Sequence, residues 1–205
     1  TAGLFQPSSR PTLSRFMSTI GVALIGCGGI ALQNHIPGLA LCPGVKVTAL
    51  CDASPEVLER ARQVSNVSFC CPDYKEVLKR DDVHAVIIAT PNFLHAPLVL
   101  DAINAGKHVF CEKPLAMNFA EAKQMYLAAE RAGVRHMTAF TYRFVPAMRY
   151  FKHLIDQGFA GQPYHFRNCR LQDWQQRGLG WRQVAKLAGS GEIGGKLSHP
   201  TRFSP

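Results

Sequence analysis

The chain has 205 residues, of which 47% are hydrophobic and 18% charged, and its formal net charge is +9. This is an ordinary soluble composition, long enough for one full core of roughly 100–150 residues and part of a second. No apolar run approaches the ~20 residues that a membrane-spanning helix requires, so we expect no membrane partner.

The positive charge is concentrated in residues 135–205, which carry 11 Lys and Arg against 3 Asp and Glu. A basic segment of this kind could attract nucleic acid. However, the basic residues are scattered among aromatic and aliphatic ones instead of forming a tract. We therefore expect them to line a site for an anionic cofactor or substrate, and we do not expect a nucleic-acid partner.

The N-terminal residues and the cysteines bear on the cellular compartment. Residues 1–16 contain two arginines, several Ser and Thr and no acidic residue, a composition that resembles an organelle transit peptide. The alternative, which we favour, is a non-native extension, because Met17 directly precedes the first strand-like run. The seven cysteines show no C-x-x-C pair and no metal-ligand spacing. Reduced thiols, no metal site and a cytoplasmic protein are the expectation.

Between residues 17 and 140, short apolar runs alternate with longer segments of helical pattern. The runs predict strands over residues 20–25, 45–51, 67–69, 85–89, 108–111 and 135–140. The intervening segments predict helices over residues 30–41, 55–64, 74–80, 94–105 and 119–132. Pro37 is expected to end or kink the first helix. The alternation predicts an α/β fold whose doubly wound parallel sheet, a Rossmann domain, occupies residues 17–140.

Capping residues support these helix boundaries. Ser54 and Asn118 are expected to cap the helices that follow them. Gly106 and Gly133 stand where a helix ends in a left-handed residue.

Residues 141–205 predict the start of a second, α+β domain that is incomplete. An amphipathic helix is expected over 146–156 and a strand over 164–171. Residues 175–205 are rich in glycine and cannot build a core alone. The apolar faces of the helix and the strand are therefore expected to be left uncovered.

A glycine turn follows the first predicted strand and opens the first helix, with the pattern G-x-G-x-x-A over residues 26–31. In such a turn, Gly26 allows the tight bend, Gly28 lets a pyrophosphate approach the backbone, and Ala31 allows close packing of the helix on the strand. The start of the helix offers unpaired N–H groups to the phosphates. The predicted cofactor contacts here are Gly26, Cys27, Gly28, Gly29 and Ile30.

Asp52 ends the second predicted strand, 26 residues after Gly26. A carboxylate at this position accepts hydrogen bonds from the hydroxyls of an adenosine ribose. Ala53 and Ser54 supply no positive charge for a 2′-phosphate, so NAD is favoured over NADP. Enzymes that use S-adenosylmethionine share both the glycine turn and the acid, and only the later motifs distinguish them.

Two further motifs follow the fourth and fifth predicted strands. They are Thr-Pro-Asn-Phe-Leu-His at 90–95 and Glu-Lys-Pro-Leu at 112–115. Both lie at carboxyl ends of strands, where an open α/β sheet binds its ligand. Together with the glycine turn, Ala-Gly-Lys-His-Val at 105–109 and Tyr-Arg-Phe at 142–144, they make the sequence resemble the Gfo/Idh/MocA family. The resemblance covers about residues 19–199, and the family includes glucose–fructose oxidoreductase and inositol dehydrogenase.

The resemblance implies a role for each matching residue. Thr90, Asn92 and His95 would line the nicotinamide side of the cofactor groove, and Glu112 would contact the nicotinamide ribose. Lys113 would lie between nicotinamide and substrate. The chemistry supports Lys113 independently, because removal of hydride from a C–H makes the neighbouring hydroxyl acidic and a lysine can take or polarise that proton. The cofactor performs the redox step, and the protein orients it.

The resemblance weakens toward the end of the sequence. Trp181 and Arg182, followed by the glycine-rich stretch 189–194, resemble the family segment that leads into Asp-x-Gly-x-His. In that alignment His199 falls on the catalytic histidine, but Gly195 replaces the aspartate. Family members continue with a large, mostly antiparallel sheet that often forms the subunit interface, so a full-length form is expected to be a homo-oligomer.

The sequence thus predicts an NAD(P)-dependent oxidoreductase that transfers hydride between nicotinamide and a secondary alcohol or carbonyl of a sugar, polyol or related compound. Lys113 is the predicted acid/base, and His199 would assist it. The predicted substrate contacts are Lys113, Tyr142, Arg143, Trp181 and Arg182. The alternative is a dinucleotide-binding protein without catalysis, regulatory or truncated. The other histidines, such as His35, His84 and His136, are interpreted as helix or strand residues without partners.

Overall fold

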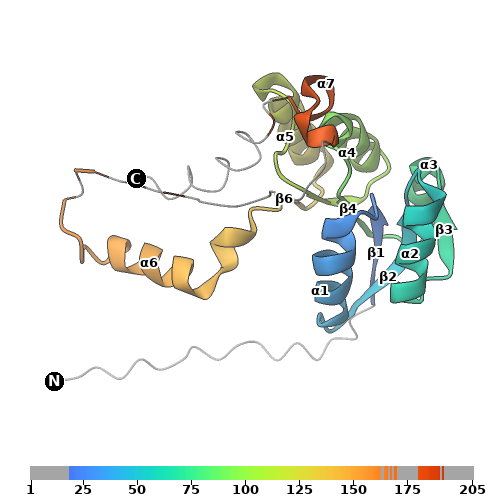
Figure 1. The fold of residues 1–205 in the computed structure, drawn as a ribbon, viewed down its shortest axis with the longest axis horizontal. Helices are drawn as coiled ribbons and strands as arrows, with labels where there is room; N and C mark the ends of the chain where they lie inside the picture. The colour runs from blue at the N-terminus through green and yellow to red at the C-terminus, as the bar shows by residue number, and fades with distance from the viewer. Residues whose placement is uncertain are drawn as a thin grey trace.

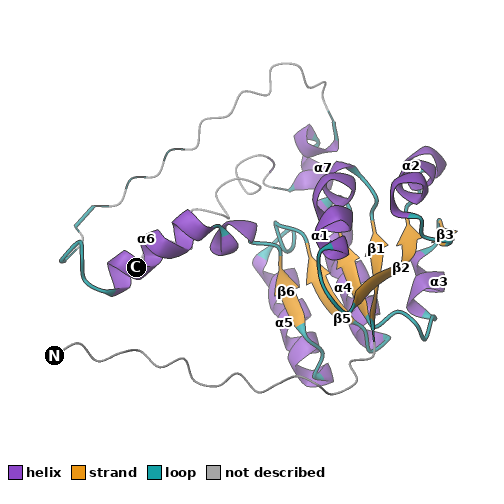
Figure 2. Ribbon diagram, turned by 90° about the horizontal axis from the view of Figure 1, so that it is seen from below, coloured by secondary structure: helices purple, strands orange, loops and turns teal. Residues whose placement is uncertain are grey.

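The computed structural model describes residues 19–162, 164, 165, 167, 169, 180–189 and 191. It contains a six-stranded sheet whose strands are all parallel and follow the order β3-β2-β1-β4-β5-β6 (Figures 1 and 2). The strands are β1 Ile20–Ile25, β2 Val45–Cys51, β3 Phe69–Cys71, β4 Ala85–Ile88, β5 His108–Cys111 and β6 His136–Thr138. The predicted doubly wound α/β fold is confirmed.

Helices cover both faces of this sheet (Figure 2). One face packs against α3 Tyr74–Leu78, α4 His95–Asn104 and α5 Phe119–Ala132, and the other against α1 Ile36–Ala40 and α2 Pro55–Ser65. Side chains of a strand alternate between the two cores: Ala23 and Ile25 enter the first, whereas Val22 and Leu24 enter the second. Burial on both faces explains why β1 is a continuous apolar run.

Local capping determines where the helices begin and end. The Ser54 hydroxyl accepts a hydrogen bond from the Val57 N–H, and the Asn118 side chain accepts one from the Glu121 N–H, as predicted. Gly133 ends α5 with a positive φ of 65°. Two predicted strands were misplaced at their ends: β3 begins two residues later than expected, and β6 is limited to three residues. In both cases the extent of pairing with the neighbouring strand sets the bounds.

The helix after the glycine turn does not end at Pro37. A π-helical turn, η1 Ala31–His35, comes first, and the Ile36 N–H donates to the Ala31 carbonyl. Pro37 then lies in the first turn of α1, where a missing N–H leaves no helical hydrogen bond unmade. The expected break is therefore replaced by a wider turn, which puts His35 above Ala31 on the side that faces the sheet.

Beyond β6, the 3-10 helix η3 Thr141–Phe144 leads into α6 Pro146–Asp156, which projects from the sheet in both ribbon views and has no buried residue (Figures 1 and 2). The apolar side chains of Tyr150 and Phe151 are exposed, as expected for an uncovered amphipathic face. Residues 1–16, half of the predicted strand 164–171 and His199 lie outside the described residues.

A short late segment packs back onto the sheet domain. It consists of the 3-10 helix η4 Trp181–Gln183 and α7 Ala185–Ala188, and Ala188 is buried. In Figure 1, α7 lies beside the carboxyl ends of the strands, near α4 and α5. The glycine-rich composition of this region gave no sign of a docked helix.

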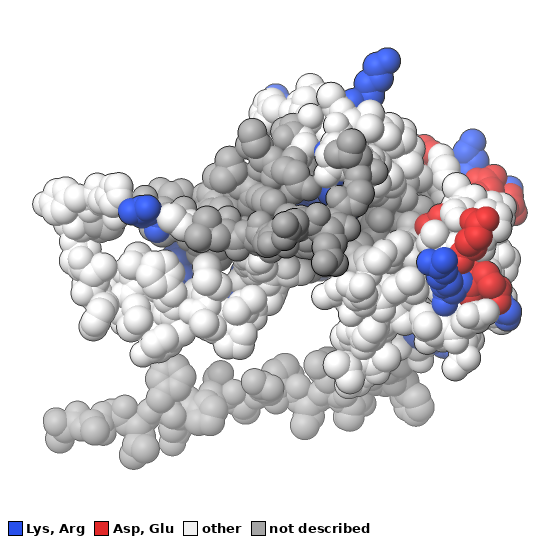
Figure 3. All heavy atoms as spheres, viewed as in Figure 1, with Lys and Arg blue, Asp and Glu red and all other residues white. Residues whose placement is uncertain are grey.

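The surface over α2 and α3 carries Lys and Arg interleaved with Asp and Glu (Figure 3). Arg62–Glu59, Lys79–Glu76 and Arg80–Asp82 form ion pairs there, so charges of one sign do not gather over these helices. Among the described residues, no helix has both the length and the apolar content needed to cross a membrane.

Substitution of Gly21 tests how closely the backbone packs at the amino end of the sheet. A Cβ at this residue would lie 1.7 Å from the Asp82 carbonyl oxygen, so Gly21→Ala must displace backbone. We expect the free energy of unfolding in urea to fall by about 2 kcal/mol or more. Gly38→Ala is the matched control: its Cβ would meet nothing within 4 Å in α1, and it should raise stability by roughly 0.5–1 kcal/mol. Equal stability of both variants would contradict the prediction.

Candidate active site

The carboxyl ends of the strands form a flush edge. The first residue after β1, β4, β5 and β6 donates its N–H to the carbonyl of the last residue of a neighbouring strand: Gly26 to Cys51 at 2.8 Å, Ala89 to Ile25 at 2.8 Å, Glu112 to Ile88 at 2.9 Å and Ala139 to Cys111 at 2.8 Å. The loops that leave β1, β4, β5 and β6 therefore begin side by side. The glycine turn and the motifs at 90–95 and 112–115 are brought together in this way, as the sequence predicted.

The glycine turn lies directly against the loop that follows β4. Gly26 has a φ of 91°, and a Cβ there would come within 2.7–2.8 Å of the backbone of Ala89 and Thr90. Glycine is thus required both by the conformation and by the close approach. This contact lies between β1 and β4, where the strand order reverses and a doubly wound sheet opens its ligand crevice.

Above the turn, the backbone is open to a ligand. A Cβ at Gly28 or Gly29 would meet nothing within 4 Å. Ile30, the N-cap of the π-helical turn, is 40% exposed, whereas Ala31 is fully buried and brings the helix close to β1. Exposed N–H groups at the start of a helix form a site for phosphate.

Asp52 ties the glycine turn to the end of β2. Its Oδ2 accepts a hydrogen bond of 2.7 Å from the Cys27 N–H, and its Oδ1 accepts one of 2.9 Å from the Ser54 N–H. The carboxylate is half-buried and keeps further lone pairs for a hydroxyl donor. Cys27 itself points into the core, where burial raises the pKa of its thiol to about 12, so it contributes backbone and not a reactive thiol.

The loop after β4 contains one polar atom that needs a partner. The Thr90 hydroxyl oxygen is buried and is the one such side-chain atom among the described residues for which the structure offers no hydrogen bond. Two residues later, the buried Asn92 amide donates to the Ala188 carbonyl at 3.1 Å. Asn92 thus anchors α7 to the loop, a contact across 96 positions that the sequence did not reveal.

His95 lies beneath two of the loops and is fully buried. Its Nδ1 is 2.8 Å from the Pro114 carbonyl, and its Nε2 is 3.0 Å from the Thr90 carbonyl. Burial lowers the pKa of His95, and the hydrogen bonds with the two carbonyls oppose this without reversing it. The ring therefore holds the loop at 90 against the loop at 114.

Glu112 is paired with a histidine in a contact that no local sequence pattern revealed. Its Oε1 is 2.9 Å from the His35 Nε2, and both side chains are about nine-tenths buried. Its Oε2 accepts from the Lys113 N–H at 3.1 Å. Burial raises the pKa of Glu112, but the hydrogen bond and charge interaction with His35, together with the N–H and the charge of Lys113, outweigh it, and the pKa is lowered overall. The carboxylate is therefore ionised at neutral pH.

The expectation that His35, His84 and His136 have no partners is wrong. Besides the His35 pair, the His84 Nδ1 accepts from the Gly21 N–H at 2.8 Å, and the His136 Nε2 is 2.9 Å from the Glu130 Oε1. All three partners lie on other elements or several residues away, so a local pattern could not identify them.

The predicted substrate contacts lie beyond the carboxyl ends of β5 and β6. Lys113 is half-buried and follows Glu112 directly. Tyr142 and Arg143 lie in η3, just after β6. The Arg182 guanidinium stacks on the Trp181 ring at 4.5 Å, next to α7. Lys113, Tyr142 and Arg143 thus lie on segments that begin at one edge of the sheet, whereas Trp181 and Arg182 belong to the late segment that contains α7.

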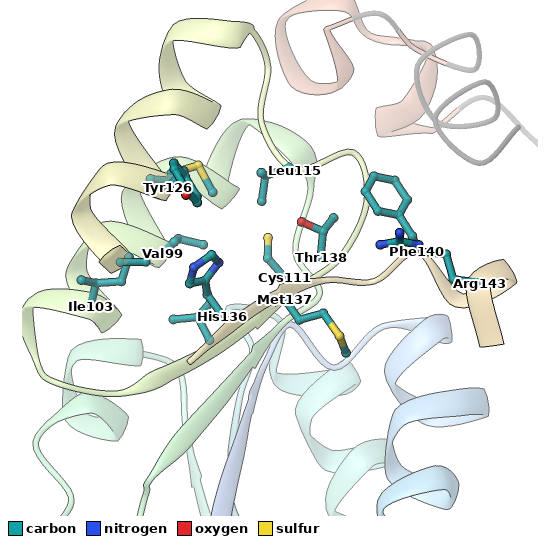
Figure 4. Close-up of a pocket in the computed structure, with 13 residues that line it drawn as sticks. Val99, Ile103, Cys111, Leu115, Tyr126, His136, Met137, Thr138, Phe140 and Arg143 are labelled. Carbon is teal, nitrogen blue, oxygen red and sulfur yellow. The ribbon is translucent and has the colours of Figure 1, made fainter. Parts of the chain in front are cut away.

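A separate cavity of about 370 Å³ opens between α4, α5 and the strands β5 and β6 (Figure 4). Apolar side chains dominate its lining, and His136, Tyr126 and Arg143 are at its polar positions. Arg143 is the one predicted site residue among its lining residues. The cavity lies on the face opposite α1, away from the glycine turn.

Comparison with known proteins agrees with this geometry. Residues 20–140 match the model of an oxidoreductase family with an NAD-binding Rossmann fold. Levoglucosan dehydrogenase of Pseudarthrobacter phenanthrenivorans is 35% identical over 193 residues, which cover 89% of this chain and 50% of the relative.

Solved structures give the same result. An oxidoreductase domain protein from Kribbella flavida superposes with a TM-score of 0.85 at 35% identity, covering 91% of this chain and 53% of that one. A levoglucosan dehydrogenase in complex with NADH and levoglucosan superposes with a TM-score of 0.80 at 34% identity, covering 90% and 52%. The chain therefore spans about half the length of the proteins that it matches.

The buried His95 predicts how stability depends on pH. The pKa of His95 in the folded protein is lowered below the ordinary value of 6.5. Near and below that pH the unfolded chain therefore binds a proton at His95 more readily than the folded protein does. As pH falls below about 6.5, the protein should lose stability relative to His95→Gln, which does not titrate there. Urea unfolding of both proteins between neutral and mildly acidic pH measures this. A relative gain for the natural protein on acidification would instead mean that the two carbonyls hold an imidazolium.

Proposed function

The chain belongs to the Gfo/Idh/MocA family of oxidoreductases with an NAD-binding Rossmann fold, and on this premise we propose that the protein is an NAD-dependent dehydrogenase or reductase acting on a secondary alcohol or carbonyl of a sugar or polyol. The observation that carries the proposal is the flush carboxyl edge. It brings the glycine turn, Asp52, Thr90 and the Glu112–Lys113 pair to one crevice. The sugar-oxidising relatives support the enzymatic interpretation over binding without catalysis.

The residues of the crevice fit a dinucleotide. Open space over Gly28 and Gly29 leaves room for a pyrophosphate on the backbone. The buried Thr90 hydroxyl has no partner within the described residues, and a polar group of a bound ligand would satisfy it. The glycine turn thus offers space for the pyrophosphate, and Thr90 offers a hydroxyl for a polar group elsewhere on the dinucleotide.

The choice of NAD over NADP rests on the residues after β2. The Asp52 carboxylate is fixed by the Cys27 and Ser54 N–H groups, so its negative charge would repel a 2′-phosphate on the ribose. Ala53 and Ser54 carry no positive charge to offset a 2′-phosphate. A carboxylate in this position favours a free 2′-hydroxyl.

In the proposed mechanism, the chain's residues orient the reactants and move one proton. The nicotinamide ring, when bound, supplies the hydride acceptor or donor. The ionised Glu112, held by His35, would accept hydrogen bonds from the ribose hydroxyls and so orient that half of the cofactor. Lys113 takes the proton from the substrate hydroxyl during oxidation and returns it to the carbonyl oxygen during reduction.

On the substrate side, we assign contacts to Tyr142, Arg143, Trp181 and Arg182. Tyr142 and Arg143 follow β6 at the edge that carries Lys113, and Trp181 and Arg182 lie next to α7. Their aromatic and guanidinium groups suit a hydroxylated ring. His199, which lies outside the described residues, would assist Lys113.

Thr90→Val tests the cofactor site in the chain as it stands. Valine keeps the shape but removes the unpartnered hydroxyl, so the stability of the free protein should be unchanged or slightly higher. The affinity for NADH measured by calorimetry should fall about fivefold, or roughly 1 kcal/mol for one lost hydrogen bond. Thr48→Val, whose hydroxyl faces the Asp82 carbonyl, is the control and should leave affinity unchanged. An unaltered NADH affinity in Thr90→Val would count against the proposed contact.

Lys113→Ala tests the chemistry in a chain extended to the length of its relatives. A panel of polyols and sugars is incubated with NAD, and the absorbance of reduced cofactor is followed. Loss of the acid/base group should lower turnover by at least about 100-fold while NADH still binds. Unchanged turnover would remove Lys113 from the mechanism, and cofactor binding with no oxidation of any compound by the natural sequence would favour the non-catalytic alternative.

A further inference from the structure

The pair formed by His35 and Glu112 joins two parts of the crevice that are far apart in the sequence. His35 ends the π-helical turn that follows the glycine turn, and Glu112 is the first residue after β5, 77 positions later. Their side chains meet at 2.9 Å, and both are about nine-tenths buried. An interaction to a charged group at this depth is shielded from solvent and is stronger than a surface ion pair.

Two contacts fix the orientation of this pair. The His35 ring meets the Phe110 ring edge to face, with centroids 5.7 Å apart and planes at 80°. Phe110 lies on β5 and packs into the core that α1 covers, and Glu112 follows two residues later, just after the strand ends. On the other side, the Lys113 N–H donates to Glu112 Oε2. The carboxylate is held from both of its oxygens.

The backbone of the helix is shaped for this contact. In η1, the hydrogen bond from the Ile36 N–H to the Ala31 carbonyl spans five residues instead of four. The wider turn puts His35 on the sheet side together with the buried Ala31 and Ile36. Such π turns occur frequently at functional sites.

We infer that His35 is a positioning residue for the nicotinamide half of the cofactor, acting through the Glu112 carboxylate that it orients. The inference rests on the proposed function, because it assigns Glu112 to the nicotinamide ribose. His35 does not itself touch the cofactor in this role. It links the helix that begins at the phosphate-binding turn to the acid at the other end of the crevice, so that both halves of the site keep a fixed spacing.

The test compares two ligands that share one half. NADH occupies the whole crevice, whereas ADP lacks the nicotinamide and its ribose. In His35→Ala, the NADH affinity measured by calorimetry should fall about tenfold, as expected for a lost hydrogen bond to a charged group, and ADP affinity should stay within about twofold. The change in NADH fluorescence on binding, which reports the surroundings of the nicotinamide, should diminish in parallel.

Three further variants separate positioning from folding. His35→Gln keeps a side-chain donor and should recover part of the NADH affinity. Adding His35→Ala to Glu112→Gln should cost less than about twofold, because the partner through which His35 acts is already altered. His136→Ala removes a histidine–glutamate pair of the same 2.9 Å length on α5 and β6, and it should leave both affinities unchanged.

Each outcome has one meaning. Equal losses of NADH and ADP affinity in His35→Ala, or an additive effect with Glu112→Gln, would show that His35 only supports the fold and would overturn the inference. Unchanged NADH affinity in folded His35→Ala would also overturn it. If His35→Ala does not fold, His35→Gln decides the question by the same ligand comparison. Failure of the natural chain to bind either ligand would reject the proposed function itself.

Discussion

The structure depends on the common register of its parallel strands at their carboxyl ends. Ile25 is paired with both Cys51 and Ile88, and Ile88 is paired with Cys111, so these strands end at the same level. The hydrogen bonds that close this edge start the next loops side by side. A one-residue slip of a strand would turn each of its side chains to the opposite face and move its loop along the edge. The site is therefore a consequence of the sheet, and its loops need little structure of their own.

Charge within the crevice is controlled by burial and pairing. Asp52 and Glu112 are both acids at the ends of strands, but their surroundings differ. Asp52 is half-buried and satisfied by two backbone N–H groups, whereas Glu112 is almost fully buried, and His35 and Lys113 lower its pKa against the effect of burial. Burial without a partner raises the pKa of a carboxyl group, and a protonated carboxyl has less capacity to accept hydrogen bonds. The histidine thus preserves the chemistry that the acid brings to the site.

The sequence predicted the sheet well because continuous apolar runs are the direct result of burial on both faces, and it predicted the crevice because glycine and acid positions follow strand ends. It could not predict contacts set by distant packing. His35 and Glu112 are 77 positions apart, and Asn92 and Ala188 are 96 apart. The prediction that Pro37 ends or kinks the first helix failed for a related reason. The π-helical turn before it places Pro37 in the first turn of α1, and no local sequence rule anticipates such a turn. The bounds of β3 and β6 depend on neighbouring strands in the same way.

The loop after β4 is the point where the sheet domain contacts the late segment that contains α7. Its Asn92 amide donates a hydrogen bond to the Ala188 carbonyl in α7, and the His95 Nε2 contacts the Thr90 carbonyl. The Thr90 hydroxyl has no hydrogen-bond partner among the described residues. A cofactor group that satisfied Thr90 would thus fix a loop that already carries α7 and, beside it, Trp181 and Arg182. Cofactor and late segment would then stabilise the same loop conformation, and each would favour the binding of the other.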